Sequence, residues 1–376
     1  MKVTRTVICK LSEECENGFA ALQDTLLQFA AACNYIREQA IQHETTSQYP
    51  LQKLTYQMVR VRYGLTANLA VRAVARVAAA FGRKKNIPKA FAPTSVDYDA
   101  RIFSFREKDW TVSLSTVNGR TRYGLAIGEY QRGMLRGQNP TAATLALTKD
   151  HFFLHIQVTI DVALSPDGEV IGVDRGIKTL AATSTARHFG GKEALHRRRT
   201  FHFRRAALQR KGTKAAKRQL KRLAGKEARW MSHVNHCLSK ELVADAQRHG
   251  ASTLVLEDLK GIRSRAYSKK LRKTVSLWNF HQLECFLTYK ANIAGMSVAK
   301  VDPAYTSQTC SRCGNVLKSQ RRGIQFQCAS CGYRNHADLN AAFNIRDRHV
   351  LSRLGRSNAP KNDPTCGSSK PREYEG

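Results

Sequence analysis

Two pairs of cysteines place the tightest limit on how this chain folds. Cys310 and Cys313 form one C-x-x-C pair, and Cys328 and Cys331 form a second pair after fourteen intervening residues. Each pair can fold into a tight turn whose thiolates occupy two corners of a tetrahedron, and a glycine follows each pair where such a turn needs a permissive backbone. Four thiolates leave no open coordination position, so the spacing predicts a structural zinc ion rather than a redox pair or unrelated thiols. Metal binding would then supply the folding energy of a segment too small for a core of its own.

The chain is strongly basic. It has 62 lysines and arginines against 29 acidic residues, a formal net charge of +33 and a pI near 10.2. Like charge of this size opposes a compact state unless a polyanion neutralises it, and nucleic acid is the polyanion that we expect. A membrane surface is the weaker alternative, because the sequence has no lipid-anchor signal and no uninterrupted apolar run of about 18 residues. With no secretory signal at the N-terminus, we expect a soluble cytoplasmic protein that associates with the nucleoid and whose remaining cysteines are free thiols.

The first part of the sequence predicts a β-barrel interrupted by helices. Residues 1–10 alternate like a strand, and residues 95–160 contain several more strands separated by turn signals such as Asn118-Gly119. Between them, apolar residues recur with a helical period, and the clearest series is Leu22, Leu26, Phe29 and Cys33. The expected segments are a β-barrel over residues 1–12 and 86–166, a helical insert over 13–85, and a turn near 166–168 that begins the next domain.

Three acidic residues stand out in the second part. Asp174 and Glu257 each end an apolar run typical of a strand buried on both faces, and Asp338 lies at an expected helix start. If the two strands are parallel neighbours, their carboxylates meet at one edge of the sheet, and the helix could bring the third acid to them. Three such carboxylates repel one another, and two Mg²⁺ ions would relieve the repulsion and promote phosphodiester hydrolysis. The alternative is that Asp338 is an N-cap and that the other two are turn residues.

Residues 197–226 contain 13 lysines and arginines and no acid. They predict a basic helix, or a helical hairpin with the stretch up to Ala246, that binds phosphates; the alternative is a solvated helix face. Phe201 and Phe203 lie among these arginines and could either stack on unpaired bases or pack into the helix seam. The candidate nucleic-acid contacts are Arg72, Arg76, Arg197, Arg198, Arg199, Arg204, Arg205, Lys217, Arg218, Lys221 and Arg222. Residues 347–376 are polar and predict a disordered tail.

The order of these features resembles the TnpB (OrfB) family of transposon-encoded RNA-guided nucleases, which is related to the type V CRISPR effectors. The matching segments are "GVDRGIKTLA", "LVLEDLKG", "SLWNFHQLECFLTYKA", "VDPAYTSQTCSRCGN" and "CASCGYRNHADLNAAFNI". They lie between about residues 170 and 345, whereas the first part of the chain resembles the family only in its layout.

The resemblance implies a multidomain α/β protein. Its N-terminal β-barrel would be wedge-like, with a helical recognition insert, and residues 167–346 would form a RuvC-like nuclease domain of RNase H type. That domain would contain a basic helical insert over 194–250 and a zinc ribbon over 304–336, and Asp174, Glu257 and Asp338 would bind catalytic Mg²⁺.

The implied function is RNA-guided cleavage of DNA beside a short adjacent motif, with a guide RNA and double-stranded DNA as partners and a monomer as the favoured state. The alternatives are an RNA-guided DNA-binding regulator that does not cleave, an accessory protein in DNA transposition, and a simple zinc-ribbon nucleic-acid binder. A regulator would be expected to lack at least one of the three acids, and a simple ribbon would leave them unexplained.

Overall fold

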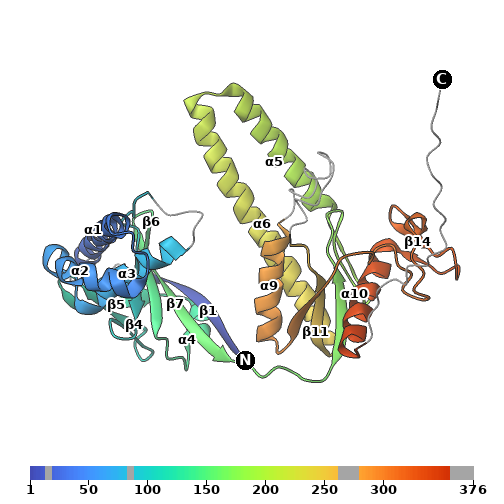
Figure 1. Cartoon of the computed structure of the whole chain (residues 1–376), viewed down its shortest axis with the longest axis horizontal. Coiled ribbons are helices and arrows are strands. Elements are labelled where there is room, and N and C mark those ends of the chain that lie inside the picture. Colours follow the sequence, from blue (N-terminus) through green and yellow to red (C-terminus); the bar gives the residue numbers. More distant parts are fainter. Residues whose placement is uncertain (13–18, 83–88, 261–278, 356–376) are drawn as a thin grey trace. The chain divides into compact units, whose positions relative to one another are not determined.

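The computed structural model describes residues 1–12, 19–82, 89–260 and 279–355 (Figure 1). The chain forms two compact units, Lys2–Asp161 and, together with Met1, Val162–Gly376. The expected tail lies outside the described residues from position 356 onward. Within the described ranges, no helix is both long and apolar enough to cross a membrane.

The first unit is built on a seven-stranded antiparallel sheet in the order β2-β6-β7-β1-β5-β4-β3. Its strands are β1 (Lys2–Leu11), β2 (Ser95–Asp99), β3 (Phe103–Arg106), β4 (Thr111–Thr116), β5 (Gly119–Ala126), β6 (Ala142–Thr148) and β7 (His151–Asp161). The two edge strands, β2 and β3, are consecutive in the chain, so the sheet curls until it is nearly closed. The predicted turn near Asn118-Gly119 joins β4 to β5, where Thr116 pairs with Gly119. A short helix that the sequence analysis did not anticipate, α4 (Glu129–Leu135), precedes β6.

Three helices are inserted between β1 and β2 and cover this sheet. They are α1 (Ala20–Gln42), α2 (Gln48–Tyr63) and α3 (Ala67–Gly82). The predicted helical series on α1 is confirmed, because Leu22, Leu26, Phe29 and Cys33 are all fully buried. These side chains belong to the same hydrophobic core as the strands, so the helices and the sheet form a single packed unit.

The second unit contains a five-stranded sheet in the order β10-β9-β8-β11-β12. The strands are β8 (Glu169–Asp174), β9 (Thr179–Thr183), β10 (His188–Gly190), β11 (Ala251–Glu257) and β12 (Ser297–Val301). Strand β9 runs antiparallel to both β8 and β10, whereas β11 pairs in parallel with both β8 and β12. Every residue of β11 is buried, which explains why its sequence is a nearly continuous apolar run.

Helices cover both faces of this sheet (Figure 1). They are α6 (Lys214–Arg248), α9 (Phe280–Ile293) and α10 (Ala337–Arg353), whereas α5 (Lys192–Lys211) packs against α6. On one face, Leu254 and Leu256 pack with residues of α6 and α9, and on the other face Val255 packs with Ile345 of α10. This alternation of side chains along β11 is what places α10, and with it Asp338, on the sheet.

The close approach of α10 to β8 depends on Gly172. An added Cβ at this position would lie 2.1 Å from the carbonyl oxygen of Ala342 and 2.6 Å from the backbone nitrogen of Arg346. Both atoms belong to the helix backbone, which cannot move aside as a flexible side chain could. The strand that ends in Asp174 therefore needs a residue without a side chain at its centre.

We expect Gly172→Ala to lower the free energy of unfolding by about 1–3 kcal/mol, because the new methyl group forces α10 away from the sheet. Thermal or urea unfolding of the whole chain measures the effect. Gly190→Ala in β10 is the matched control, since a Cβ there has no atom within 4 Å. Equal stability of the two variants would contradict this account of the packing.

One segment boundary from the sequence analysis is wrong. The polar tail was expected from residue 347, but α10 continues to Arg353. The reason is a contact that the sequence does not display: the Arg348 guanidinium donates hydrogen bonds to the carbonyl oxygens of Asp302 and Ala304, at 2.6 and 2.8 Å. These bonds fasten the last turns of the helix to the chain that follows β12.

Candidate functional site

Two of the three acidic residues lie side by side at the carboxyl ends of β8 and β11. The strands pair in parallel with Val173 opposite Leu256, so Asp174 and Glu257 occupy the next position on each strand. Glu257 is 8% exposed, and its carboxylate accepts a hydrogen bond from the Thr306 hydroxyl at 2.5 Å. Both carboxylates thus emerge at one edge of the sheet.

The third acid, Asp338, lies in the first turn of α10. The helix is capped by His336, whose ring accepts a hydrogen bond from the Asp338 backbone N–H, so the alternative that Asp338 is the N-cap residue is wrong. Its carboxylate instead pairs with Arg321, at 2.9 Å between Oδ1 and Nη2. The side chain of Asp338 is therefore free of a capping role.

The electrostatics link Asp174 to the other two acids. Burial raises the pKa of Asp174 above its usual range, and the negative charges of Glu257 and Asp338 raise it further. Burial also raises the pKa of Glu257, against the opposing effect of its hydrogen bond from Thr306. Arg175 and Arg321 oppose both shifts. A cluster of acids whose ionisation is unfavourable in the absence of a cation is a candidate cation site.

Arg175, which the sequence analysis passed over, ties the two acidic strands together. Its side chain is fully buried, and Nη2 donates to the backbone carbonyl of Glu257 at 2.5 Å. Its Nη1 pairs with Glu284 of α9 at 3.3 Å, and Glu284 in turn pairs with Lys300 of β12 at 2.5 Å. The available signal in the sequence is an arginine that directly follows an apolar strand and its terminal acid. A buried guanidinium at such a position needs acceptors from other parts of the chain.

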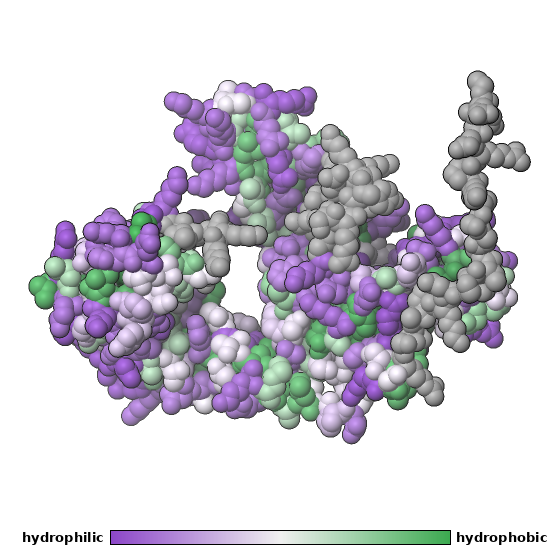
Figure 2. Space-filling view, in the orientation of Figure 1, coloured by the Kyte–Doolittle hydropathy of each residue, from purple (hydrophilic) through white to green (hydrophobic). Residues whose placement is uncertain are grey.

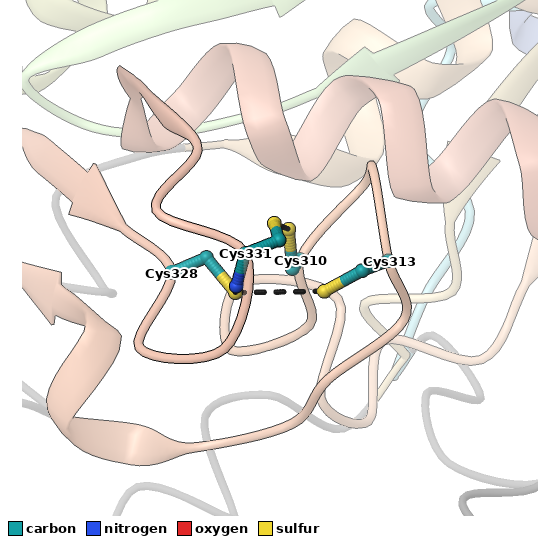
Figure 3. A group of neighbouring side chains, drawn as sticks. All are labelled: Cys310, Cys313, Cys328 and Cys331. Carbon is teal, nitrogen blue, oxygen red and sulfur yellow. Dashed lines mark hydrogen bonds between the residues drawn. The ribbon is translucent and has the colours of Figure 1, made fainter.

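The four predicted zinc ligands come together in a second cluster. Figure 3 shows their side chains converging, and all four sulfur atoms lie within 4.8 Å of one another. The Sγ atoms of Cys313 and Cys328 are 3.5 Å apart, and those of Cys310 and Cys331 are 3.8 Å apart. A tetrahedral site with metal–sulfur bonds of about 2.3 Å requires sulfur–sulfur distances of about 3.8 Å. The donor set and its spacing therefore fit a zinc ion.

The segment around these cysteines is small. It contains the strands β13 (Arg321–Arg322), β14 (Gln325–Gln327) and β15 (Arg334–His336) and a short 3₁₀ helix, η1 (Lys318–Gln320). Both glycines that follow the cysteine pairs have positive φ, +77° at Gly314 and +69° at Gly332, as the knuckle turns require. Its buried apolar cluster consists of little more than two of the cysteines, Phe326 and Ala337. A core of this size leaves most of the stability to the metal.

Two asparagines fasten the first cysteine knuckle to α10. The side chain of Asn340 is fully buried; it donates to the carbonyl oxygen of Thr309 at 2.7 Å and accepts from the Ser311 N–H at 3.0 Å. Asn344, one turn later, donates to the carbonyl oxygens of Thr306 and Thr309. The sequence analysis missed both residues, although two asparagines four positions apart on an apolar helix face were the available signal. They explain why the cysteine motif lies so near Asp338: the knuckle and the acid share one helix.

We expect Asn340→Ala to lower the free energy of unfolding by about 1–3 kcal/mol, because it leaves the partly buried Ser311 N–H without its acceptor. The loss should appear first as faster hydrogen exchange in residues 306–311. Asn292→Ala is the control, since this α9 side chain makes no hydrogen bond within the described part of the chain. Unchanged exchange in the knuckle would show that Asn340 is not an anchor.

The basic stretch forms an antiparallel helical hairpin of α5 and α6, joined at Gly212 (Figure 1). Two of the candidate nucleic-acid contacts form ion pairs within the hairpin instead, because Arg198 and Arg205 both pair with Glu227. The two phenylalanines differ: Phe201 is buried against Trp230, whereas Phe203 is 71% exposed. The other candidates on the hairpin, Arg197, Arg199, Arg204, Lys217, Arg218, Lys221 and Arg222, are exposed.

The two candidates in the first unit lie on α3. Arg76 pairs with Asp97 of β2 at 2.8 Å and lies over the ring of Phe29, so its guanidinium holds the helix to the sheet. Arg72 is partly buried, and its Nε has no hydrogen-bond partner among the residues that the structure describes. Nucleic-acid contacts by these two residues stay a prediction.

Two family models match parts of the second half of the chain. The model described as "Probable transposase" matches residues 154–263, and the model described as "Cas12f1-like, TNB domain" matches residues 280–345. A TnpB-like protein of Methanocaldococcus jannaschii is 32% identical over 128 residues, which cover 34% of this chain and 45% of the relative. The resemblance to the TnpB family is confirmed.

The type V CRISPR effectors give the second set of matches. The CRISPR-associated endodeoxyribonuclease Cas12f1 of Sulfoacidibacillus thermotolerans is 34% identical over 194 residues, 47% of this chain and 45% of the relative. The matched region thus spans about half the length of the curated relatives. A cryo-EM structure of a Cas12f1–sgRNA–target DNA complex superposes with a TM-score of 0.64 at 14% identity, covering 88% of this chain and 83% of that one. At this identity the likeness concerns the fold alone.

Proposed function

We propose that this protein is an RNA-guided DNA endonuclease that hydrolyses phosphodiesters at a Mg²⁺ site formed by Asp174, Glu257 and Asp338. The proposal is supported by the placement of Asp174 and Glu257 at the ends of neighbouring parallel strands and by the charges of Glu257 and Asp338, which both raise the pKa of Asp174. Neither a helix cap nor a turn requires a buried carboxylate with two further acids near enough to disfavour its ionisation.

The arrangement of the second unit supports a RuvC-like domain of RNase H type. Its sheet combines three antiparallel strands with two parallel ones, and the acids follow the first and fourth strands in chain order. The names of the relatives, a TnpB-like protein and a CRISPR-associated endodeoxyribonuclease, point to the same class. In this proposal the hairpin of α5 and α6 and the cysteine ribbon are the two insertions in the nuclease domain.

The three carboxylates would hold the metal, which when bound supplies an activated water and stabilises the leaving oxygen of the phosphodiester. The chain's other residues set the geometry. Thr306 orients the Glu257 carboxylate through its hydroxyl, and Arg175 fixes the end of β11 against that of β8. Arg321 lies beside Asp338 and supplies a positive charge at the edge of the site. The zinc ion of the four cysteines would be structural and would keep Arg321 and the start of α10 in place.

The partners in this proposal are a guide RNA and a double-stranded DNA target, with sequence read by base pairing and by a short adjacent motif. The complex named in the superposed structure contains an sgRNA and target DNA, which supports these partners. The wedge-like first unit would hold the guide and read the adjacent motif. Exposed cations on the outer surface of the hairpin would contact the phosphates of the guide–target duplex.

Sequencing of the RNA that co-purifies with the full chain, followed by plasmid cleavage with that RNA, tests the proposal. We expect one discrete RNA species and Mg²⁺-dependent cutting of a plasmid that carries the matching target. Guided binding without any cutting would favour the regulator instead, and the absence of a discrete RNA would contradict the proposal as a whole.

A further inference from the structure

A groove runs along one face of the hairpin formed by α5 and α6. It consists of two adjoining hollows of about 320 and 460 Å³. Arg204 and Lys226 line both hollows and so mark the point where they meet. Figure 2 shows an apolar strip between two hydrophilic margins over the hairpin, at the top of the view.

The groove has an apolar floor and a cationic rim. The apolar lining residues are Phe201, Ala207, Leu208 and Leu223. The basic lining residues are Arg197, Arg204, Lys211, Arg222 and Lys226. Glu193 is the one acid among the lining residues. A ligand that fits this lining carries a row of negative charges for the rim. It also presents less polar surface to the floor.

The rim cations are available for a ligand. The acid in the seam of the hairpin, Glu227, is 12% exposed and is neutralised by Arg198 and Arg205, neither of which lines the groove. Arg204, Arg222 and Lys226 form no ion pair with any residue in the described ranges. The arginines that neutralise Glu227 in the seam are therefore different from the basic residues that line the groove.

We propose that this groove binds a single-stranded segment of nucleic acid, with phosphates on the cationic rim and sugars or bases on the apolar floor. The inference rests on the proposed function in taking the polyanion to be nucleic acid. A duplex offers mainly phosphates to a protein surface, and its stacked bases cannot reach an apolar floor, whereas a single strand exposes both kinds of surface. In this proposal the outer face of the hairpin still binds the guide–target duplex.

Two triple variants with the same loss of charge test the proposal. The groove variant is Arg204→Gln/Arg222→Gln/Lys226→Gln, and the matched control is Arg199→Gln/Arg218→Gln/Lys221→Gln, whose three positions do not line the groove. Each is made in the full chain, and circular dichroism verifies the hairpin. The probes are a short fluorescent oligo(dT) and a hairpin duplex of the same charge, titrated at several salt concentrations.

For oligo(dT), we expect the groove variant to bind about tenfold or more weakly, because the rim loses phosphate contacts and the counterion release that they bring. The dependence of log affinity on log salt should also become shallower, by about 0.7 for each of these phosphates. The control variant should retain most of its affinity for oligo(dT) and should lose more affinity for the duplex. Equal losses in the two variants, or an equal effect of the groove variant on both probes, would overturn the proposal.

The apolar floor gives an independent measurement. We expect Leu223→Ser to weaken oligo(dT) binding without changing the salt dependence, because it removes apolar surface and no charge. Polyglutamate, a polyanion without bases, should bind Leu223→Ser and the parent chain about equally, because it presents no base or sugar to the apolar floor. An equal loss of polyglutamate and oligo(dT) binding in Leu223→Ser would contradict a role of the floor in binding bases or sugars. These titrations need no cleavage, so their failure is separate from a failure of the nuclease proposal.

Discussion

Asp174→Ala, Glu257→Ala and Asp338→Ala should each reduce plasmid cleavage by about three orders of magnitude or more, while guided DNA binding stays close to that of the parent chain. Each substitution removes a carboxylate that would hold the metal, and metal-ion catalysis lowers the activation barrier by several kcal/mol. Binding is expected to survive because the cations of the hairpin are untouched. Cleavage rates at saturating Mg²⁺, measured beside gel-shift affinities, give both quantities.

Asp258→Ala is the matched control for this series. Asp258 follows Glu257 directly, but its carboxylate accepts a hydrogen bond from the Lys260 N–H at 3.0 Å, as a turn residue does. We expect its loss to leave the cleavage rate nearly unchanged. A variant of Asp174, Glu257 or Asp338 that cuts at the parent rate would remove that residue from the proposed site.

The metal-free protein offers a second measurement of the same cluster. The pKa of Asp174 is raised in the folded chain, so the folded state binds more protons than the unfolded state between the two pKa values, and stability falls as the pH rises through that range. Asp174→Asn removes this ionisation without a change in size. It should therefore raise the melting temperature at neutral pH in the presence of a chelator, and the gain should shrink as the pH is lowered toward 4, near the ordinary pKa of an aspartate.

Much of the site could be predicted from short patterns because its main residues are marked locally. An apolar run that ends in an acid indicates a buried strand and the edge at which its carboxylate emerges, and this pattern marks Asp174 and Glu257. Spacing alone marks the four cysteines, since a metal site constrains sequence more strongly than packing does. Both predictions needed only residues within a few positions of one another.

The residues that the sequence analysis missed act through contacts that are distant in the chain. Arg175 bonds to the carbonyl of a residue 82 positions away, and Asn344 bonds to one 38 positions away. Neither residue type reveals its partner, because arginine and asparagine are more often exposed. The different surroundings of Phe201 and Phe203 also depend on α6, because its packing against α5 buries one side of that helix and leaves the other exposed.

The four-cysteine centre should contain one zinc ion per chain, and Cys328→Ser should release it. The measured free energy of structural zinc sites, about 10–16 kcal/mol in small peptides, exceeds what a core of this size can replace, so the ribbon should unfold locally. Zinc analysis and hydrogen exchange over residues 304–336 measure the two effects. Cys237→Ser, at an exposed cysteine outside the cluster, is the control.

Loss of the zinc should also reduce cleavage, although no cysteine belongs to the acidic cluster. The ribbon carries Arg321, which pairs with Asp338, and its first knuckle is held by Asn340 and Asn344 of α10. Unfolding the ribbon therefore frees the start of the helix that positions the third acid, whereas oligo(dT) binding by the hairpin should persist. Purified protein that lacks zinc yet keeps slow exchange in the ribbon would contradict a structural metal. Full cleavage by Cys328→Ser would instead show that α10 holds Asp338 in place without the ribbon.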